Sequence, residues 1–165
     1  MEEMRVYIAN LGKYNEGELV GDWFIPPIDY DEVAERIGLN DEYEEFAIHD
    51  YELPFEIDEY TSIEEINRLC EMVEELDYPL CEVIDELVGV FGSLEELCEH
   101  KDDIIHLSGC NDMTDVAYYY IDECCALGDI PDHLSRYIDY ESFGRDLDLE
   151  GRFVETKYGI FECPW

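Results

Sequence analysis

Positive charge is scarce in this sequence of 165 residues. Nine lysines and arginines stand against 45 aspartates and glutamates, a formal net charge of −36, and each base is isolated among acids. Phosphate backbones and anionic lipid surfaces are bound by clusters of Lys and Arg, which neutralise the negative charge. The composition therefore argues against nucleic acid and membranes as partners. A surface this negative suits a positively charged protein, a cation, or simple solubility.

Other signals are missing too. No apolar stretch approaches the 18 residues of a membrane span, and the N-terminus lacks the charged and apolar regions of a signal peptide, so we expect a cytoplasmic protein. The seven cysteines include no C-x-x-C pair, which favours free, mostly buried thiols over a zinc ribbon or a disulfide framework. Metal-binding histidine spacings, a P-loop and a G-x-S-x-G turn are all absent. We therefore expect no enzyme activity and no cofactor.

The hydrophobic content indicates a folded protein in spite of the charge. Hydrophobic residues make up 47% of the chain and aromatic residues 13%, enough apolar surface to offset chain entropy. The pattern predicts an α+β protein made of three small modules in a row. These are a β-rich module with one short helix at 1–61, a small helical bundle at 62–103, and an α+β module at 104–165.

The first module is predicted from β-prone runs. Arg5–Ala9 and Leu19–Ile25 form a hairpin around turn residues 15–17, and Phe46–Tyr51 forms a third strand. Asp29 caps a short helix that ends at Gly38.

The second module begins at Ser62, which forms a capping box with Glu65 and opens a helix with one apolar stripe. A second helix starts at Pro79 and stops at Gly89, and Ser93 to Glu96 repeats the capping pattern.

In the third module, one helix is predicted from Thr114 to Ala126 and another from Pro131 to Tyr140. A turn at 149–151 then leads into β structure from Phe153 to Cys163.

The acids are spread over all three modules. The modules contain 18, 14 and 13 acids against 3, 2 and 4 bases, which gives net charges of −15, −12 and −9. The charge is therefore expected on folded surface rather than in a tail. Duplex DNA with the same 36 charges would be roughly 60 Å long. A compact sphere of this chain would be only about 40 Å across, so matching the charge spacing of DNA favours an elongated molecule.

Two weak motifs leave a metal-dependent alternative open. Asp146–Gly151 resembles the first half of an EF-hand loop, although Lys157 occupies the position of the bidentate glutamate. Glu155 and Lys157, with Asp146 or Asp148 upstream, resemble the acid and lysine set of magnesium-dependent nucleases. Two functions therefore stay open from the residues: a calcium- or magnesium-binding protein, or a generic acidic interaction protein or chaperone for basic partners.

Long strings of the sequence resemble the ArdA family of antirestriction proteins, and the likeness spans nearly the whole chain. The strings are RVYIANLGKYNEG (5–17), GDWF (21–24), EFAIHDYE (45–52), IPDHL (130–134), YIDYE (137–141) and GRD (144–146). The resemblance implies a bacterial protein carried on conjugative plasmids or transposons. It also implies a DNA mimic that occupies the DNA-binding channel of type I restriction-modification enzymes and blocks restriction and modification. It further implies a homodimer formed through the C-terminal module, with no catalytic centre.

The resemblance implies where the carboxylates that stand in for phosphates lie. The segment from Asp112 to Glu123 matches the family's antirestriction motif, which suggests Asp112, Asp115, Asp122 and Glu123. Further acids expected to bind the partner are Asp129, Asp132, Glu64, Glu71, Glu74, Glu75, Glu82, Asp85 and Glu86.

Overall fold

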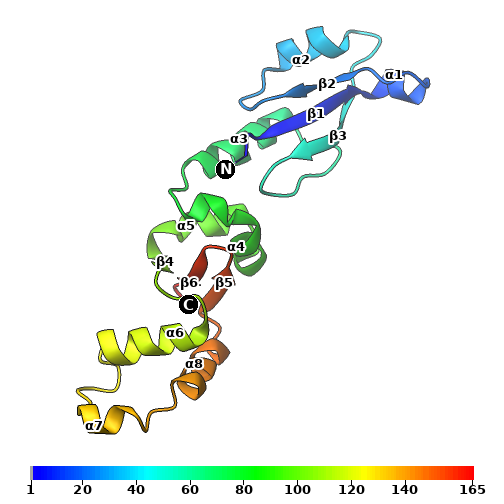
Figure 1. Ribbon diagram of the computed structural model, residues 1–165. Coiled ribbons are helices and arrows are strands. Elements are labelled where there is room, and N and C mark those ends of the chain that lie inside the picture. Colours follow the sequence, from blue (N-terminus) through cyan, green and yellow to red (C-terminus); the bar gives the residue numbers. More distant parts are fainter. Residues whose placement is uncertain (1) are drawn as a thin grey trace.

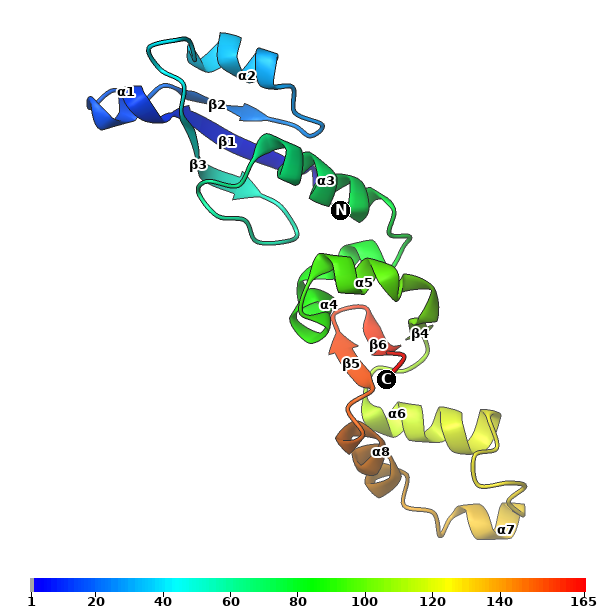
Figure 2. The ribbon, with the colours of Figure 1, turned by 180° about the vertical axis from the view of Figure 1, so that it is seen from behind.

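The computed structural model describes residues 2–165 and confirms an α+β protein. Within these residues the chain forms eight α-helices and two three-stranded sheets. In both views the molecule is elongated, with the first sheet near one end and α7 (Asp132–Ser135) at the other (Figure 1, Figure 2). The expected division into modules 1–61, 62–103 and 104–165 stays a prediction.

The first sheet is antiparallel and has the strand order β2-β1-β3. Its elements are β1 (Arg5–Asn10), α1 (Leu11–Asn15), β2 (Gly21–Phe24), α2 (Tyr30–Ile37) and β3 (Phe46–Glu52). The three strands and the helix capped by Asp29 are confirmed, but the short helix α1 was not predicted. Buried Asn10 explains it: its side-chain oxygen accepts a hydrogen bond from the Lys13 amide and caps α1.

Three helices follow the sheet: α3 (Ile63–Glu74), α4 (Ile84–Phe91) and α5 (Leu94–Glu99). Ser62 and Ser93 cap α3 and α5 by accepting from the amides three residues on, as predicted. The predicted single helix from Pro79 to Gly89 is wrong. A 3-10 turn at Leu80–Glu82 precedes α4. The helix α4 continues past Gly89 to Phe91, and Gly92 is its C-cap, with a left-handed backbone at a φ of 93°.

The C-terminal third begins with a 3-10 turn at Lys101–Asp103 and β4 (Ile105–Leu107). Then α6 (Met113–Tyr118) runs into one turn of π-helix at Tyr119–Glu123, so the helix predicted to Ala126 ends earlier.

The helix predicted from Pro131 to Tyr140 is also wrong, because α7 spans only Asp132–Ser135 and a new helix, α8 (Tyr140–Leu149), starts where it should have ended. Asp139 opens α8 by accepting hydrogen bonds from the amide and hydroxyl of Ser142. The predicted return to β structure is confirmed as a hairpin of β5 (Phe153–Thr156) and β6 (Gly159–Glu162), and the second sheet has the order β4-β6-β5.

Two clusters of buried apolar side chains hold these elements together. The larger joins the first sheet and α2 to α3, α4 and α5, and it includes Phe161 from β6. Its residues therefore come from both sides of the boundaries expected at residues 61 and 103. The smaller joins α6 to α8 and the second sheet through residues such as Val116, Leu147 and Ile160. Within residues 2–165 we find no helix both long and apolar enough to cross a membrane.

Candidate partner-binding surface

Every acidic side chain of the protein lies at least partly in solvent. The single buried polar residue among residues 2–165 is Asn10. Seven acids are partly exposed and the others are exposed; the seven are Asp22, Glu65, Glu82, Glu86, Glu95, Asp115 and Glu162. Because nine bases cannot neutralise 45 acids, solvent is the medium that stabilises most of these charges. The negative charge is therefore available to a partner.

Helix N-termini stabilise part of this charge. Acids occupy the first turns of α2, α3, α4, α5, α6 and α8. The partial positive charge of a helix N-terminus stabilises each such carboxylate by about 0.3–1 kcal/mol. Among the predicted site residues, Glu64, Asp85, Glu86 and Asp115 lie in such positions. The fold thus uses backbone dipoles where basic side chains are lacking.

The predicted acids of α3 form a row on its outer face. Ile63, Ile66, Cys70 and Val73 are buried on the inner face, which leaves the acids of the same helix toward solvent. Glu64, Glu71, Glu74 and the C-cap Glu75 are all exposed.

The charge density of this row is comparable with that of DNA. Five acids and one arginine lie on the 12 residues of α3 and its C-cap, a length of about 20 Å at 1.5 Å per residue. This corresponds to one net charge per about 5 Å, against 3.4 Å along one DNA strand.

Arg68 holds α3 and α5 together at the surface. It donates to both oxygens of Glu65, at 2.9 and 2.6 Å, and to Glu95 of α5 at 2.6 Å. The hydrogen bonds from Arg68 lower the pKa of both carboxyl groups. At the other end of α3, Lys101 lies 3.6 Å from the carboxylate of Glu75. These pairs offset the repulsion between acids of neighbouring helices.

Six more of the predicted acids lie on the arm, by which we mean residues 112–139. Asp112 caps α6 by accepting from the Asp115 amide at 2.9 Å, and Asp115 accepts from the Asn111 amide at 2.9 Å. Both acids therefore have a structural role at the start of α6. Glu123 is exposed at the end of the π-helical turn.

Further along the arm, a hollow of about 670 Å³ brings three predicted acids together. Its lining includes Asp122, Asp129, Asp132 and Arg136. Asp122 accepts a hydrogen bond from the Tyr140 hydroxyl at 2.9 Å. Burial, followed by this hydrogen bond, raises the pKa of Tyr140. The hollow is thus an acidic surface with one arginine.

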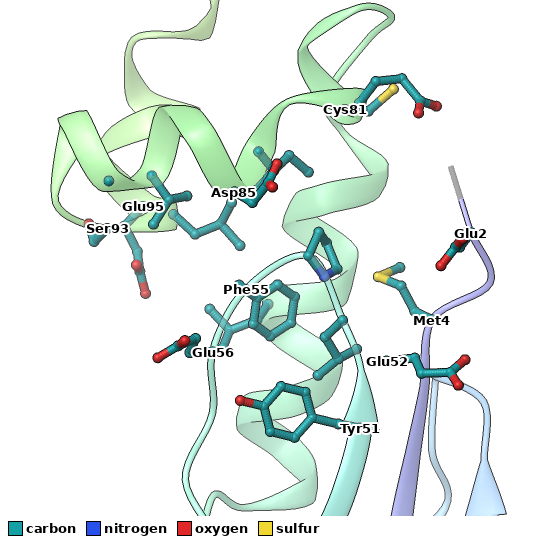
Figure 3. Close-up of a pocket in the computed structure, with 18 of the residues that line it drawn as sticks. Glu2, Met4, Tyr51, Glu52, Phe55, Glu56, Cys81, Asp85, Ser93 and Glu95 are labelled. Atoms are coloured by element: carbon teal, nitrogen blue, oxygen red, sulfur yellow. The ribbon is translucent and has the colours of Figure 1, made fainter. Parts of the chain in front are cut away.

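A larger groove, of about 1200 Å³, lies between the first sheet and the helices that follow it. Glu82 and Asp85 line it, as predicted acids, while Glu86 instead accepts a hydrogen bond from the Lys157 amide. Figure 3 shows Phe55 near its centre, Glu2 and Met4 on one side, and Ser93 and Glu95 on the other. The prediction missed the other groove acids, which are Glu2, Glu52, Glu56, Glu65 and Glu95. No local pattern marks them, because they come from four separate parts of the chain.

The structure contradicts the EF-hand reading. Asp146 and Asp148 lie within α8, and an EF-hand requires its ligands on a loop. Glu155 belongs to β5, whereas Lys157 lies in the turn before β6. Among residues 2–165, no three His, Cys, Asp or Glu side chains are grouped so that they could hold a metal ion.

Fold and surface together define a class: a small α+β protein whose exposed carboxylates are its dominant chemical feature. A family model described as Antirestriction protein (ArdA) matches residues 6–162. The chain therefore belongs to the ArdA family of antirestriction proteins. A comparison with curated proteins gave no match.

Proposed function

We propose that the protein is a DNA mimic that occupies the DNA-binding channel of type I restriction-modification enzymes. The observation that carries the proposal is that all 45 acids are at least partly exposed, with nine bases to offset them. The carboxylates of α3, α4 and the arm stand where DNA would present phosphates. The enzyme then exchanges one polyanion for another.

The physical chemistry of such an exchange sets its properties. Charge complementarity accelerates encounter, and screening by salt weakens it. A row of carboxylates carries no base-edge pattern, so inhibition is independent of the recognition sequence of the enzyme. Both restriction and modification require the bound DNA, so both are blocked.

We further propose that the protein acts as a homodimer in the bacterial cytoplasm, joined through residues 104–165. Exposed apolar side chains on the arm support this, since Leu127, Leu134 and Tyr137 are 53%, 45% and 72% exposed. Large exposed apolar side chains gathered on one segment are common at interaction surfaces. Sedimentation of the protein at several concentrations tests the dimer, and a monomer at all of them contradicts it.

The function is tested by competition for a type I enzyme. A fluorescent duplex with the recognition site is bound to the enzyme, and the protein is added at two salt concentrations. We expect the duplex to be released intact at near-equimolar protein, with weaker competition at the higher salt. Enzyme that stays on the duplex in excess protein contradicts the proposal.

A control separates mimicry from general acidity. A basic protein without a DNA channel, such as a histone, is titrated with the same protein at the same salt concentrations. We expect much weaker binding to the histone, because rigidly held charges bind more tightly to a channel whose own charges match their positions. Equally tight binding to the histone would favour the generic acidic chaperone instead.

A further inference from the structure

The groove between the first sheet and α4 differs from the rest of the acidic surface because it has an apolar lining. Met4, Leu53, Leu69 and Val88 line it and are only partly buried against the larger core. Its volume of about 1200 Å³ exceeds the usual range of small-ligand pockets, roughly 300–1,000 Å³. The groove is therefore large enough for a segment of polypeptide.

Carboxylates surround this apolar lining. Arg5 pairs with Glu52, while Arg68 pairs with Glu65 and Glu95. Glu56 and Asp85 also line the groove and are exposed, and neither makes an ion pair within residues 2–165. Lys157 is the single base among the lining residues, against seven acids, so the rim has negative charge left for a partner.

Charge decides between the possible occupants. A second copy of this chain would bring its own acidic surface to an acidic rim, which is repulsive, and the proposed dimer is joined through residues 104–165 instead. A basic segment with apolar side chains matches both the rim and the lining. DNA offers no counterpart to this apolar contact. The groove therefore adds an apolar contact to the charge contacts of phosphate mimicry.

We propose that this groove binds a basic amphipathic segment of the inhibited enzyme, with apolar side chains against Leu69 and Val88 and Lys or Arg side chains at Glu56 and Asp85. The identity of the partner rests on the proposed function. The groove contact makes the inhibitor bind more tightly than its charge alone would allow.

Two neighbouring positions of α4 allow a matched test without any change of charge. Gly89 lines the groove, and nothing lies within 4 Å of a Cβ added there, so Gly89→Phe introduces an aromatic side chain at the groove. Val90 is 44% exposed and is not part of the groove lining, so Val90→Phe adds a similar ring outside it. Val88→Thr is a second variant that keeps the side-chain volume and adds a hydroxyl group to the lining.

The dissociation constant of each variant from the DNA-recognition core of a type I enzyme is measured at several salt concentrations. We expect Gly89→Phe to weaken binding about tenfold, a change of 1.4 kcal/mol, with the same salt slope as the wild type because the charge is unchanged. Val88→Thr should also weaken binding, whereas Val90→Phe should leave binding unchanged.

If both groove variants bind like Val90→Phe, the groove proposal is wrong and the DNA-mimic proposal stands. If the wild-type protein does not bind the enzyme, both are wrong.

Discussion

Replacing Gly144 and Gly89 by alanine should change stability in opposite directions. Both glycines lie inside α-helices, α8 and α4. Helix propensity alone favours alanine over glycine by about 1 kcal/mol at either position. The surroundings differ, because Gly144 is buried against α6 whereas nothing lies within 4 Å of a Cβ added at Gly89.

The magnitude follows from the contact at Gly144. An added Cβ would lie 2.8 Å from the Met113 carbonyl carbon and 3.2 Å from the Thr114 nitrogen, and nearest of all to the Met113 carbonyl oxygen. These are backbone atoms, which cannot rotate away, so we take the upper end of the overpacking cost, about 3 kcal/mol. After the propensity gain, Gly144→Ala should destabilise the fold by about 2 kcal/mol.

Thermal unfolding followed by circular dichroism measures both changes. For a chain of this length, 1 kcal/mol corresponds to roughly 2–4 °C in Tm. We expect Gly89→Ala to raise Tm by about 2–4 °C and Gly144→Ala to lower it by about 4–8 °C. If Gly144→Ala unfolds at or above the wild-type temperature, α8 does not approach the backbone of α6 closely enough at Gly144 to exclude a Cβ.

Three further predictions concern single side chains. Arg68→Met should destabilise the protein at neutral pH but not in acid. The lowered pKa of its two carboxylate partners contributes stability above their unfolded pKa, and that stability is lost as the pH falls; equal losses in urea melts at pH 7 and pH 3 would contradict this. Asp112→Ala should cost about 1 kcal/mol in the same melts because it removes the N-cap of α6, while Asp112→Asn should keep the cap; equal losses for the two would show that charge matters more than capping. Burial raises the pKa of Cys70 and Cys163 to about 11, so mass spectrometry after brief alkylation at pH 8 should find exposed Cys124 modified long before either of them.

Local signals in the sequence predicted much of the secondary structure. Ser62 and Ser93 were recognisable as caps because a serine hydroxyl needs only the amide three residues on. Gly89 and Gly92 show the limit of such signals. Either glycine can end a helix, and the backbone conformation of Gly92 in the folded chain made it the end.

The helix α8 was missed for a similar reason. Asp146, Asp148 and Gly151 have the spacing of a calcium loop, but Leu147 of the same stretch packs into the smaller core against α6. Tertiary packing overrode the local pattern. The EF-hand alternative fails because these acids lie within a helix whose apolar residue between them, Leu147, is buried.

The candidate site was predictable in charge but not in shape. Composition alone placed the acids in solvent, because 36 uncompensated carboxylates cannot be buried. The assignment of Asp122, Asp129 and Asp132 to one hollow needed the structure.

The sequence by itself determined the charge, the Ser62 and Ser93 helix caps and the family of this protein, since these depend on residue identity and on neighbours a few positions apart. Only the tertiary structure decided how Arg68 joins α3 to α5, and how Met4, Leu69 and Val88 meet in one acidic-rimmed groove. Contacts between distant parts of a chain depend on how its apolar faces pack, and that packing leaves no local pattern in the order of residues.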